Sequence, residues 1–395
     1  MPPCLPLELV EEVVASLHHD RETLLQASLV NSEFCVACQP HIFHSMCLLR
    51  GDRKVPSSRV QYGNLRLPAT TILSMATIIA EAPHLARHIH DFGFDLPISE
   101  DDDAALAAVL PRFEGLERVI VLGGTQRWDS ISMDLDAAVT GMIMRGRLEH
   151  LHLFEVRLVS RATVLLCMRM TSKFSFTGGS LDEKSDEVEL DDSAPPARLR
   201  QLIVHERPEP ILSLIASLPK TAFKISELTC MPFTSREAPS VGLYSHLLPQ
   251  SLTSLDIACT GAPAFLLPPL DNLTSLALRY DRGDKLYLPR TLPPTLAALP
   301  LLPRLKIVFY ARVKSPAVLW NASPVTPLPG AAQFSVRNIV FGLHANVSQR
   351  MLNSGTQLPR LESSFIDAMT AALPPPTFDL EFEFMKGQEG YGFPE

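Results

Sequence analysis

A short apolar pattern recurs along most of the chain, in the form apolar-x-x-apolar-x-apolar. Its last three positions alternate, and such alternation is typical of a short strand that buries every second side chain. The pattern is clear at residues 116–121, 148–153, 199–204, 252–257, 273–278 and 302–307. Weaker copies fall at residues 89–94, 171–176 and 225–230. We therefore predict a strand at each copy.

The copies begin 21 to 32 residues apart, which overlaps the period of about 20 to 29 residues in leucine-rich repeats. One such unit cannot bury its own apolar face, whereas a stack of units forms a continuous core. Helical or proline-rich segments should connect the strands, with helices at residues 71–82, 104–110, 137–144 and 209–218. The sequence thus predicts an α/β fold, built as an irregular leucine-rich-repeat-like solenoid with a parallel sheet.

The first part of the chain has a different, helical period. Leu9, Val10, Val13, Val14 and Leu17 recur at the spacing of one helix face. A polar break at residues 18–20 is followed by a second apolar helix at residues 24–30 and a third that closes near residue 43. Three helices of this size form a small core, so an apolar face left after packing would favour a partner.

These helices resemble the F-box, particularly the form common in fungal proteins. The residues that carry the resemblance are Leu5-Pro6-Leu7-Glu8-Leu9, Leu17, Ala27-Ser28-Leu29-Val30, Phe34 and Phe43. Many members have tryptophan where this chain has Phe34. The family binds the small adaptor of a cullin–RING ubiquitin ligase through this unit. Carried over by position, the adaptor-facing residues are Leu5, Pro6, Leu9 and Val13, completed or supported from behind by Leu24, Leu29, Val30 and Phe34.

Three segments follow from these patterns. Residues 1–50 form the F-box-like three-helix cap, and residues 51–310 form the repeat body. Residues 311–395 begin with a proline-rich connection at 311–333 and continue as a capping piece with strands near 336–341 and 378–384 and a helix at 358–373. An acidic run at residues 182–192 is expected to be a solvated loop.

Composition narrows the classes of function. The chain has 395 residues, 46% of them hydrophobic and 20% charged, which is typical of a globular protein. Its net charge is −8 and it has no cluster of basic residues, so we expect no nucleic-acid partner. We expect no membrane partner either, because prolines interrupt the longest uncharged run, at 315–336. Without a basic segment in front of its first apolar residues, the protein is expected in the cytoplasm or nucleus with reduced cysteines.

Candidate chemistry is sparse in the sequence. No nucleophile, phosphate-loop or zincin motif is present, so we predict neither an enzyme nor a cofactor. Cys35, Cys38, His41 and His44 include zinc-ligand types, but all lie on or beside one short helix, which favours core positions over a metal site. His150 and His152 alternate with Leu151, so they should face away from the core and toward solvent. Gly123-Gly124 and Gly178-Gly179 are expected in turns.

The function indicated by the resemblance is that of a non-catalytic substrate receptor of a cullin–RING ubiquitin ligase. Its cap would bind the adaptor, and its repeats would bind a protein substrate of unknown identity. The alternative is a repeat-based interaction scaffold whose drifted cap no longer binds the adaptor. An apolar surface on the packed cap would favour the receptor, and a polar surface would favour the scaffold.

Overall fold

The computed structural model falls into two compact units, Met1–Leu199 and Arg200–Glu395. The repeat body expected at residues 51–310 extends over both units, and the boundaries expected near residues 50 and 310 remain predictions. The residues that the structure describes are 5–50, 59–62, 65–124, 126–182, 197–219, 222–231, 251–258, 270–281, 304–313, 338–347 and 379–386.

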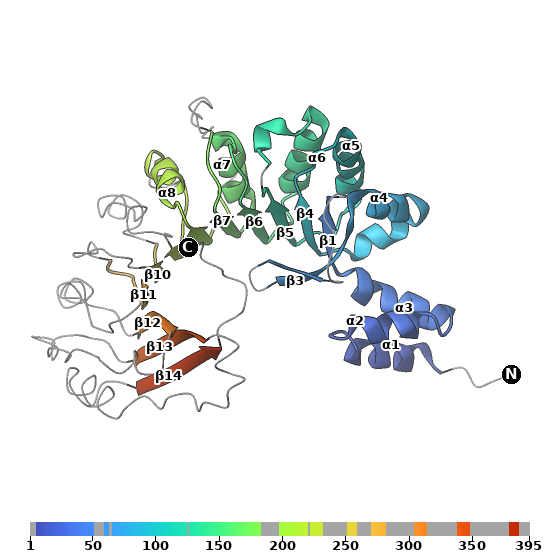
Figure 1. The fold of residues 1–395 in the computed structure, drawn as a ribbon, viewed down its shortest axis with the longest axis horizontal. Helices are drawn as coiled ribbons and strands as arrows, with labels where there is room; N and C mark the ends of the chain where they lie inside the picture. The colour runs from blue at the N-terminus through green and yellow to red at the C-terminus, as the bar shows by residue number, and fades with distance from the viewer. Residues whose placement is uncertain are drawn as a thin grey trace, which may run out of the picture. The chain divides into compact units, whose positions relative to one another are not determined.

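The first unit begins with the three predicted helices. They are α1 (Leu7–Ser16), α2 (Arg21–Ser28) and α3 (Ser32–Phe43). Both α1 and α2 pack against α3, and the three form the dark-blue group next to the N-terminus (Figure 1). Strand β1 (Ser45–Leu49) starts two residues after α3 ends, so the last residues of the predicted cap segment belong to the sheet.

The rest of the first unit is a sheet with helices on one face (Figure 1). Its strands have the order β2-β3-β1-β4-β5-β6-β7, and every neighbouring pair is parallel except β2–β3. The remaining elements are β2 (Arg59–Tyr62), β3 (Leu65–Thr71), α4 (Ile72–Glu81), η1 (Pro83–His88), β4 (Asp91–Asp95), α5 (Glu100–Val109), η2 (Leu110–Arg112), β5 (Arg118–Leu122), η3 (Trp128–Ser130), α6 (Met133–Met144), β6 (His150–Phe154), α7 (Arg161–Met170) and β7 (Lys173–Thr177). Helix α7 was not predicted from the sequence.

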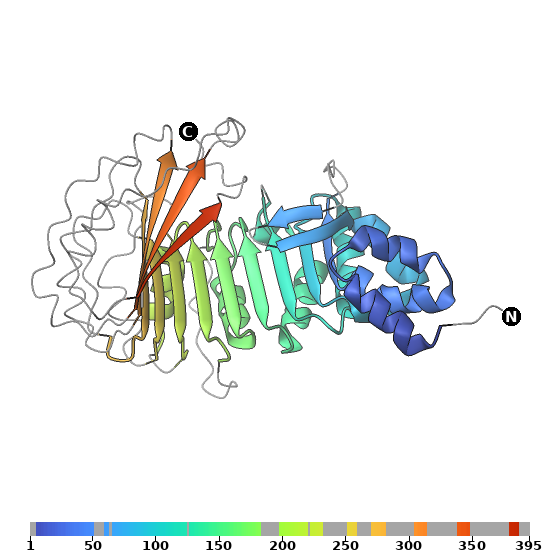
Figure 2. The same ribbon diagram turned by 90° about the horizontal axis from the view of Figure 1, so that it is seen from below.

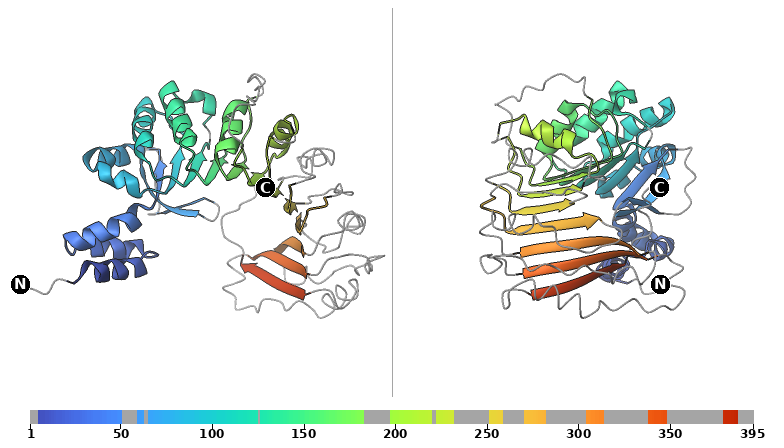
Figure 3. Two further views of the ribbon diagram at one scale, coloured as in Figure 1. Left: turned by 180° about the vertical axis from the view of Figure 1, so that it is seen from behind. Right: turned by 60° about the vertical axis from the view of Figure 1, so that its left-hand side comes forward.

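The second unit has parallel strands that pair in chain order (Figure 3, right). Its elements are β8 (Gln201–His205), α8 (Glu209–Ala216), β9 (Glu227–Met231), β10 (Ser254–Ala258), β11 (Ser275–Asp281), β12 (Arg304–Val313), β13 (Asn338–Val347) and β14 (Asp379–Lys386). Strand β12 runs through Val313, so the first residues of the expected 311–333 connection are strand. The expected helix at 358–373 and almost all of the acidic run at 182–192 lie outside the described residues.

The strand register brings the apolar positions of the repeat into rows. Leu151 lies between Val119 and Phe174, and two residues further along each strand Leu153 lies between Val121 and Phe176. All six side chains are buried. Figure 2 shows the strands side by side in a common direction, which keeps these rows continuous. Each copy of the pattern therefore buries its apolar side chains against the next copy.

The opposite face of the sheet is also apolar over part of the first unit. Cys47, Leu49, Ile120 and Leu122 form a buried cluster there, and Ala69 of β3 and Phe154 pack against it. Strand β5 is consequently buried on both faces, which explains its uninterrupted run Val119-Ile120-Val121-Leu122.

The same turn recurs at the start of successive strands. The carbonyl oxygen of His44 accepts hydrogen bonds from the backbone N–H groups of His90 and Asp91, both at 2.9 Å. The carbonyl of His90 does the same for the next strand, at Glu117 and Arg118. In the second unit the double acceptors are Arg200, Ser226 and Thr253. At each of these steps one carbonyl satisfies two backbone donors.

These observations establish an α/β fold with an open parallel sheet and a group of N-terminal helices. Every strand predicted from the repeated pattern is present. The assignment of the repeats to the leucine-rich-repeat class, as a solenoid, remains a prediction. In the part of the chain that the structure describes, no helix is both long enough and apolar enough to span a membrane.

The predicted turn glycines follow β5 and β7. Gly124 and Gly178 have φ angles of 57° and 64°, a backbone conformation that favours glycine. Gly123 and Gly179 are needed for a different reason, which is close approach of the chain. A Cβ at Gly123 would lie 2.5 Å from the Cα of Val156, and one at Gly179 would lie 2.5 Å from the carbonyl oxygen of Val156.

We predict that Gly123→Ala destabilises the protein, because the new methyl group meets backbone that cannot move independently. The expected loss in the free energy of unfolding is about 1 to 3 kcal/mol. Gly141 of α6 provides the matched control, because a methyl group added there would have no atom within 4 Å. Gly141→Ala should stabilise by about 0.5 to 1 kcal/mol. Urea unfolding monitored by circular dichroism measures both, and equal effects would contradict this account.

Candidate protein-binding surface

The three N-terminal helices share a small core. Val10, Val14, Leu24, Cys38 and Ile42 are buried in it. Partly buried side chains pack around them, namely Leu17, Ala27, Phe34, Ala37 and Phe43. The helices therefore pack as the helical period predicted, with one apolar stripe of each facing inward.

The helix starts are fixed by polar side chains. The Asp20 carboxylate accepts a hydrogen bond from the backbone N–H of Thr23 at 3.1 Å, and the Asn31 amide oxygen accepts one from that of Phe34 at 2.9 Å. Each bond satisfies a donor that has no partner inside its helix. The short turns before α2 and α3 are held in place in this way.

A second set of apolar side chains on the same helices remains in water. Leu29 and Val30, in the turn between α2 and α3, are 79% and 66% exposed. The complete set of large exposed apolar residues here is Leu5, Leu7, Leu9, Val13, Leu25, Leu29, Val30 and Val36. Most of the exposed large apolar side chains among the described residues lie in these helices or directly beside them, and such grouping is typical of protein-interaction surfaces. We refer to these eight residues as the apolar cap surface.

The sequence-predicted adaptor residues divide into two groups in the structure. Leu5, Pro6, Leu9, Val13, Leu29 and Val30 are exposed. Leu24 is buried, and Phe34 is half-buried and packs against the core, so these two support the surface from behind. The sequence did not single out Leu7, Leu25 and Val36. Leu25 follows the buried Leu24 directly, and adjacent helical residues point about 100° apart. The sequence could therefore have predicted that Leu25 is exposed.

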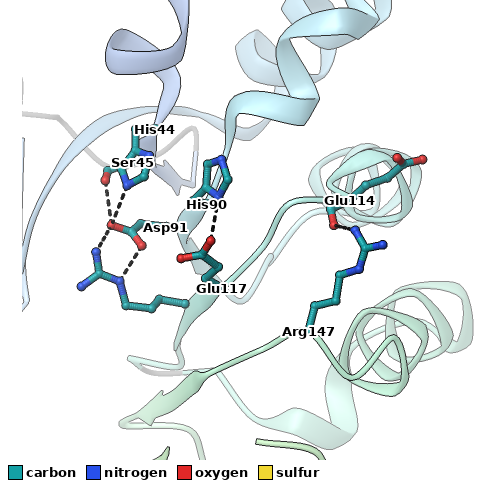
Figure 4. A network of polar contacts seen from close by, with 8 residues as sticks. His44, Ser45, His90, Asp91, Glu114, Glu117 and Arg147 are labelled. Atoms are coloured by element: carbon teal, nitrogen blue, oxygen red, sulfur yellow. Dashed lines mark hydrogen bonds and ion pairs between the residues drawn. The ribbon is translucent and has the colours of Figure 1, made fainter. Parts of the chain in front are cut away.

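The helices are joined to the sheet by a buried carboxylate (Figure 4). Asp91 of β4 is 5% exposed. It accepts a hydrogen bond from the Ser45 hydroxyl at 2.9 Å, and the His44 imidazole lies 3.9 Å from it. The Arg118 guanidinium pairs with both carboxylate oxygens, with Nε at 2.6 Å from Oδ1. The hydrogen bond to Asp91 raises the pKa of Arg118, so the guanidinium stays charged.

Further contacts lie beside this group of residues around Asp91, which we call the Asp91 joint (Figure 4). The rings of His44 and His90 stack with their centroids 5.0 Å apart. His90 Nδ1 lies 3.2 Å from a carboxylate oxygen of Glu117. Further along, Arg147 donates a hydrogen bond to the carbonyl of Glu114 at 3.0 Å. The residues just after α3 are therefore fixed to β4 and β5 by side chains as well as by backbone.

His150 and His152 face away from Leu151, as predicted, but they are half-buried rather than solvent-exposed. His150 Nε2 lies 2.8 Å from the Ser175 hydroxyl, and His152 Nε2 lies 3.0 Å from that of Thr177. Burial lowers the pKa of His150 to about 3, and the nearby Lys173, His152 and Arg118 contribute to the lowering. His150 is therefore neutral at physiological pH and acts as a packed, hydrogen-bonded side chain of the sheet.

The Cys35, Cys38, His41 and His44 set is spread over different environments. Cys38 is in the core of the helices, Cys35 and His41 are half-buried, and His44 takes part in the Asp91 joint. Within the described ranges, no three His, Cys, Asp or Glu side chains are arranged to hold a metal ion.

Comparison with models of protein families and with curated proteins finds no match to this chain. The functional interpretation therefore depends on the sequence pattern and on the geometry of the N-terminal helices. That geometry, an apolar surface on helices whose own core is already filled, is suited to binding another protein.

We predict that Asn31→Ala lowers the stability of the helical cap by about 1 kcal/mol, because it removes the hydrogen bond that starts α3. Ser32→Ala, at the next and exposed position, is the matched control and should be neutral or slightly stabilising. Hydrogen exchange of the α3 amides measures the effect. Equal exchange rates in the two variants would contradict the role of Asn31.

We also predict an acid-sensitive contribution from His150. Its pKa is depressed in the folded protein, so the unfolded chain binds a proton that the folded chain does not. The stability that this group contributes is complete above about pH 6.5 and is lost as the pH falls toward about 3. At pH 5 the loss is about 1 to 2 kcal/mol. His150→Gln should flatten the pH dependence of urea unfolding over this window, whereas His19→Gln, at an exposed histidine, should preserve it.

Proposed function

We propose that this protein is a non-catalytic substrate receptor of a cullin–RING ubiquitin ligase. The single observation that carries the proposal is the apolar cap surface. Leu5, Leu9, Val13, Leu29 and Val30 are exposed after the helices have packed, and these are positions that the F-box resemblance assigns to adaptor contact. A polar surface there would have favoured the scaffold alternative.

The size of these side chains is sufficient for a specific contact. Removal of apolar surface from water contributes about 25 cal/mol per Å², or about 1.5 to 3 kcal/mol for each fully buried Leu or Val. Binding sites usually depend on a few such anchors surrounded by contacts of little energy. Leu29 and Val30 are the most exposed of the group, so they have the most surface to bury against an adaptor.

The Asp91 joint supports the same function. A receptor contributes to ubiquitin transfer by holding the substrate near the reactive thioester, so its effect is one of proximity and orientation. A cap on a flexible linker would lose much of that effect. Here β1 follows α3 almost directly, and Ser45 and Arg118 hold Asp91 between them.

The repeats are the proposed substrate-binding part. Part of one sheet face in the first unit is already covered, because Cys47, Leu49, Ile120 and Leu122 are buried there. On the same face His150 and His152 of β6 are half-buried, and Ser175 and Thr177 of β7 are buried. In the first unit, a protein substrate would therefore contact the partly exposed side chains of this face, such as His150 and His152, rather than the buried cluster.

A binding assay with the purified ligase adaptor tests the proposal. We expect the folded chain to bind, and we expect the double variant Pro6→Ala, Leu9→Ala and the double variant Leu9→Asn, Leu29→Asn each to lose affinity by about tenfold or more. Leu73→Asn is the matched control, because Leu73 is an equally exposed leucine near the start of α4, outside the cap surface.

Circular dichroism and thermal unfolding establish that each variant is folded before binding is compared. Absence of binding by the folded parent chain would exclude the receptor and leave the interaction scaffold. Equal losses in Leu73→Asn and in the cap variants would show that the apolar cap surface is not the contact.

A further inference from the structure

Two thiols lie one helical turn apart in α3. Cys38 is fully buried among Val10, Val14, Leu24 and Ile42, in the middle of the small core. Cys35 lies at the boundary of that core and is half-buried. Its sulfur accepts a long hydrogen bond of 3.9 Å from the side-chain amide of Gln39. Neither sulfur is used by the apolar cap surface or the Asp91 joint.

Helix geometry brings these residues close without allowing them to bond as they stand. With a rise of about 1.5 Å per residue and a radius of about 2.3 Å, Cα atoms three residues apart are separated by about 5 Å. A disulfide accepts Cα separations of about 4.4 to 6.8 Å but requires its Cβ atoms within about 3.5 to 4.5 Å. Helical Cβ atoms at this spacing are about 5 to 6 Å apart. The bond can therefore form only if the turn from 35 to 38 is distorted.

We propose that hydrogen peroxide converts Cys35 and Cys38 into a reversible disulfide, and that this bond opens the turn of α3 from residue 35 to residue 38 and weakens adaptor binding by the cap. The inference rests on the proposed function for its consequence, but the disulfide and the change in the helix do not depend on it. Strained disulfides of this kind are the easily reduced, regulatory ones.

The chemistry is balanced with the peroxide as the oxidant. The Cys35 thiolate attacks the O–O bond, which leaves Cys35 as a sulfenic acid and releases one water after protonation. The Cys38 sulfur then displaces the sulfenic hydroxyl, which leaves as a second water, and the S–S bond forms. Two thiols lose two protons and two electrons, and the peroxide accepts both. A dithiol reductant reverses the reaction by exchange.

The environment of the two sulfurs assigns their order of reaction. Burial raises the pKa of Cys38, and the neighbouring Cys35 raises it further, so Cys38 stays a thiol while Cys35 reacts first. Cys167, elsewhere in the first unit, is more deeply protected, because burial raises its pKa to about 12. Cys47 and Cys230 are buried as well, which leaves Cys35 as the accessible starting point among the cysteines that the structure describes.

The consequence reaches the apolar cap surface by a short route. To bond with Cys35, the Cys38 sulfur must leave its place beside Val14 and Leu24, which opens a void in a core of five buried residues. The distorted turn begins four residues after the Asn31 cap, on the helix that follows the exposed pair Leu29 and Val30. Oxidation thus removes support from behind the surface and distorts the helix that follows it.

The test uses the full-length chain, reduced or treated with hydrogen peroxide, with three measurements on each sample. Peptide mass spectrometry should find a loss of two hydrogens linking Cys35 to Cys38. Hydrogen exchange of amides 33–38 should speed up by about tenfold or more on oxidation. Adaptor affinity should fall by about tenfold or more and recover with dithiothreitol. Cys35→Ser should abolish all three responses, and Cys47→Ser should preserve them.

The outcomes separate this inference from the proposed function. If the reduced chain does not bind the adaptor, the receptor function fails, while the disulfide and the exchange of amides 33–38 still decide the redox inference. If peroxide produces no Cys35–Cys38 bond, or produces it with unchanged exchange and unchanged binding, the redox inference is overturned. Cys35→Ala serves as a second variant if Cys35→Ser does not fold.

Discussion

The burial of each strand by its neighbours is the constraint on which the rest of the structure depends. Leu151 and Leu153 of β6 lie beside Val119 and Val121 on one side and Phe174 and Phe176 on the other. A strand of this kind gains its full hydrophobic stabilisation only when both neighbours are present. Every connection must therefore return the chain to the same register. The carbonyls that accept two backbone N–H groups, and the glycines that allow the loop at Val156 to approach, are consequences of that requirement.

The same constraint explains how the helical cap is attached. Strand β1 begins almost directly after α3, so the orientation of the cap follows from the position of β1 in the sheet. Asp91 is buried at this point, and a buried carboxylate is stable only with partners. Ser45 from β1 and Arg118 from β5 supply them. A charge that would be unfavourable alone thus links β1, β4 and β5, which are neighbours in the sheet, and holds the end of α3 against the repeats.

Much of this fold could be predicted from the sequence, and the failures have specific physical causes. Alternating apolar positions located β4 to β14, because each of these segments carries apolar residues two positions apart. Strand β1 was missed because Met46, Cys47, Leu48 and Leu49 are all buried, and a continuous apolar run does not distinguish a strand from the end of a helix. The direction of His150 followed from alternation, but its hydrogen-bond partner Ser175 and the Lys173 charge that helps to lower its pKa lie on the next strand. Such partners are known only once the register is known.

The candidate surface shows a related limit. Sequence spacing could assign Val10 and Leu24 to a core, and the resemblance could assign Leu9 and Leu29 to a partner. Only the packed helices show which side chains are buried in the core and which are exposed for binding. That separation has an energetic consequence. A core of five buried residues stabilises the cap modestly, and a partner that binds only the packed form adds stability by mass action. Folding and binding of the cap are then linked, so a change at one core position such as Cys38 acts on both.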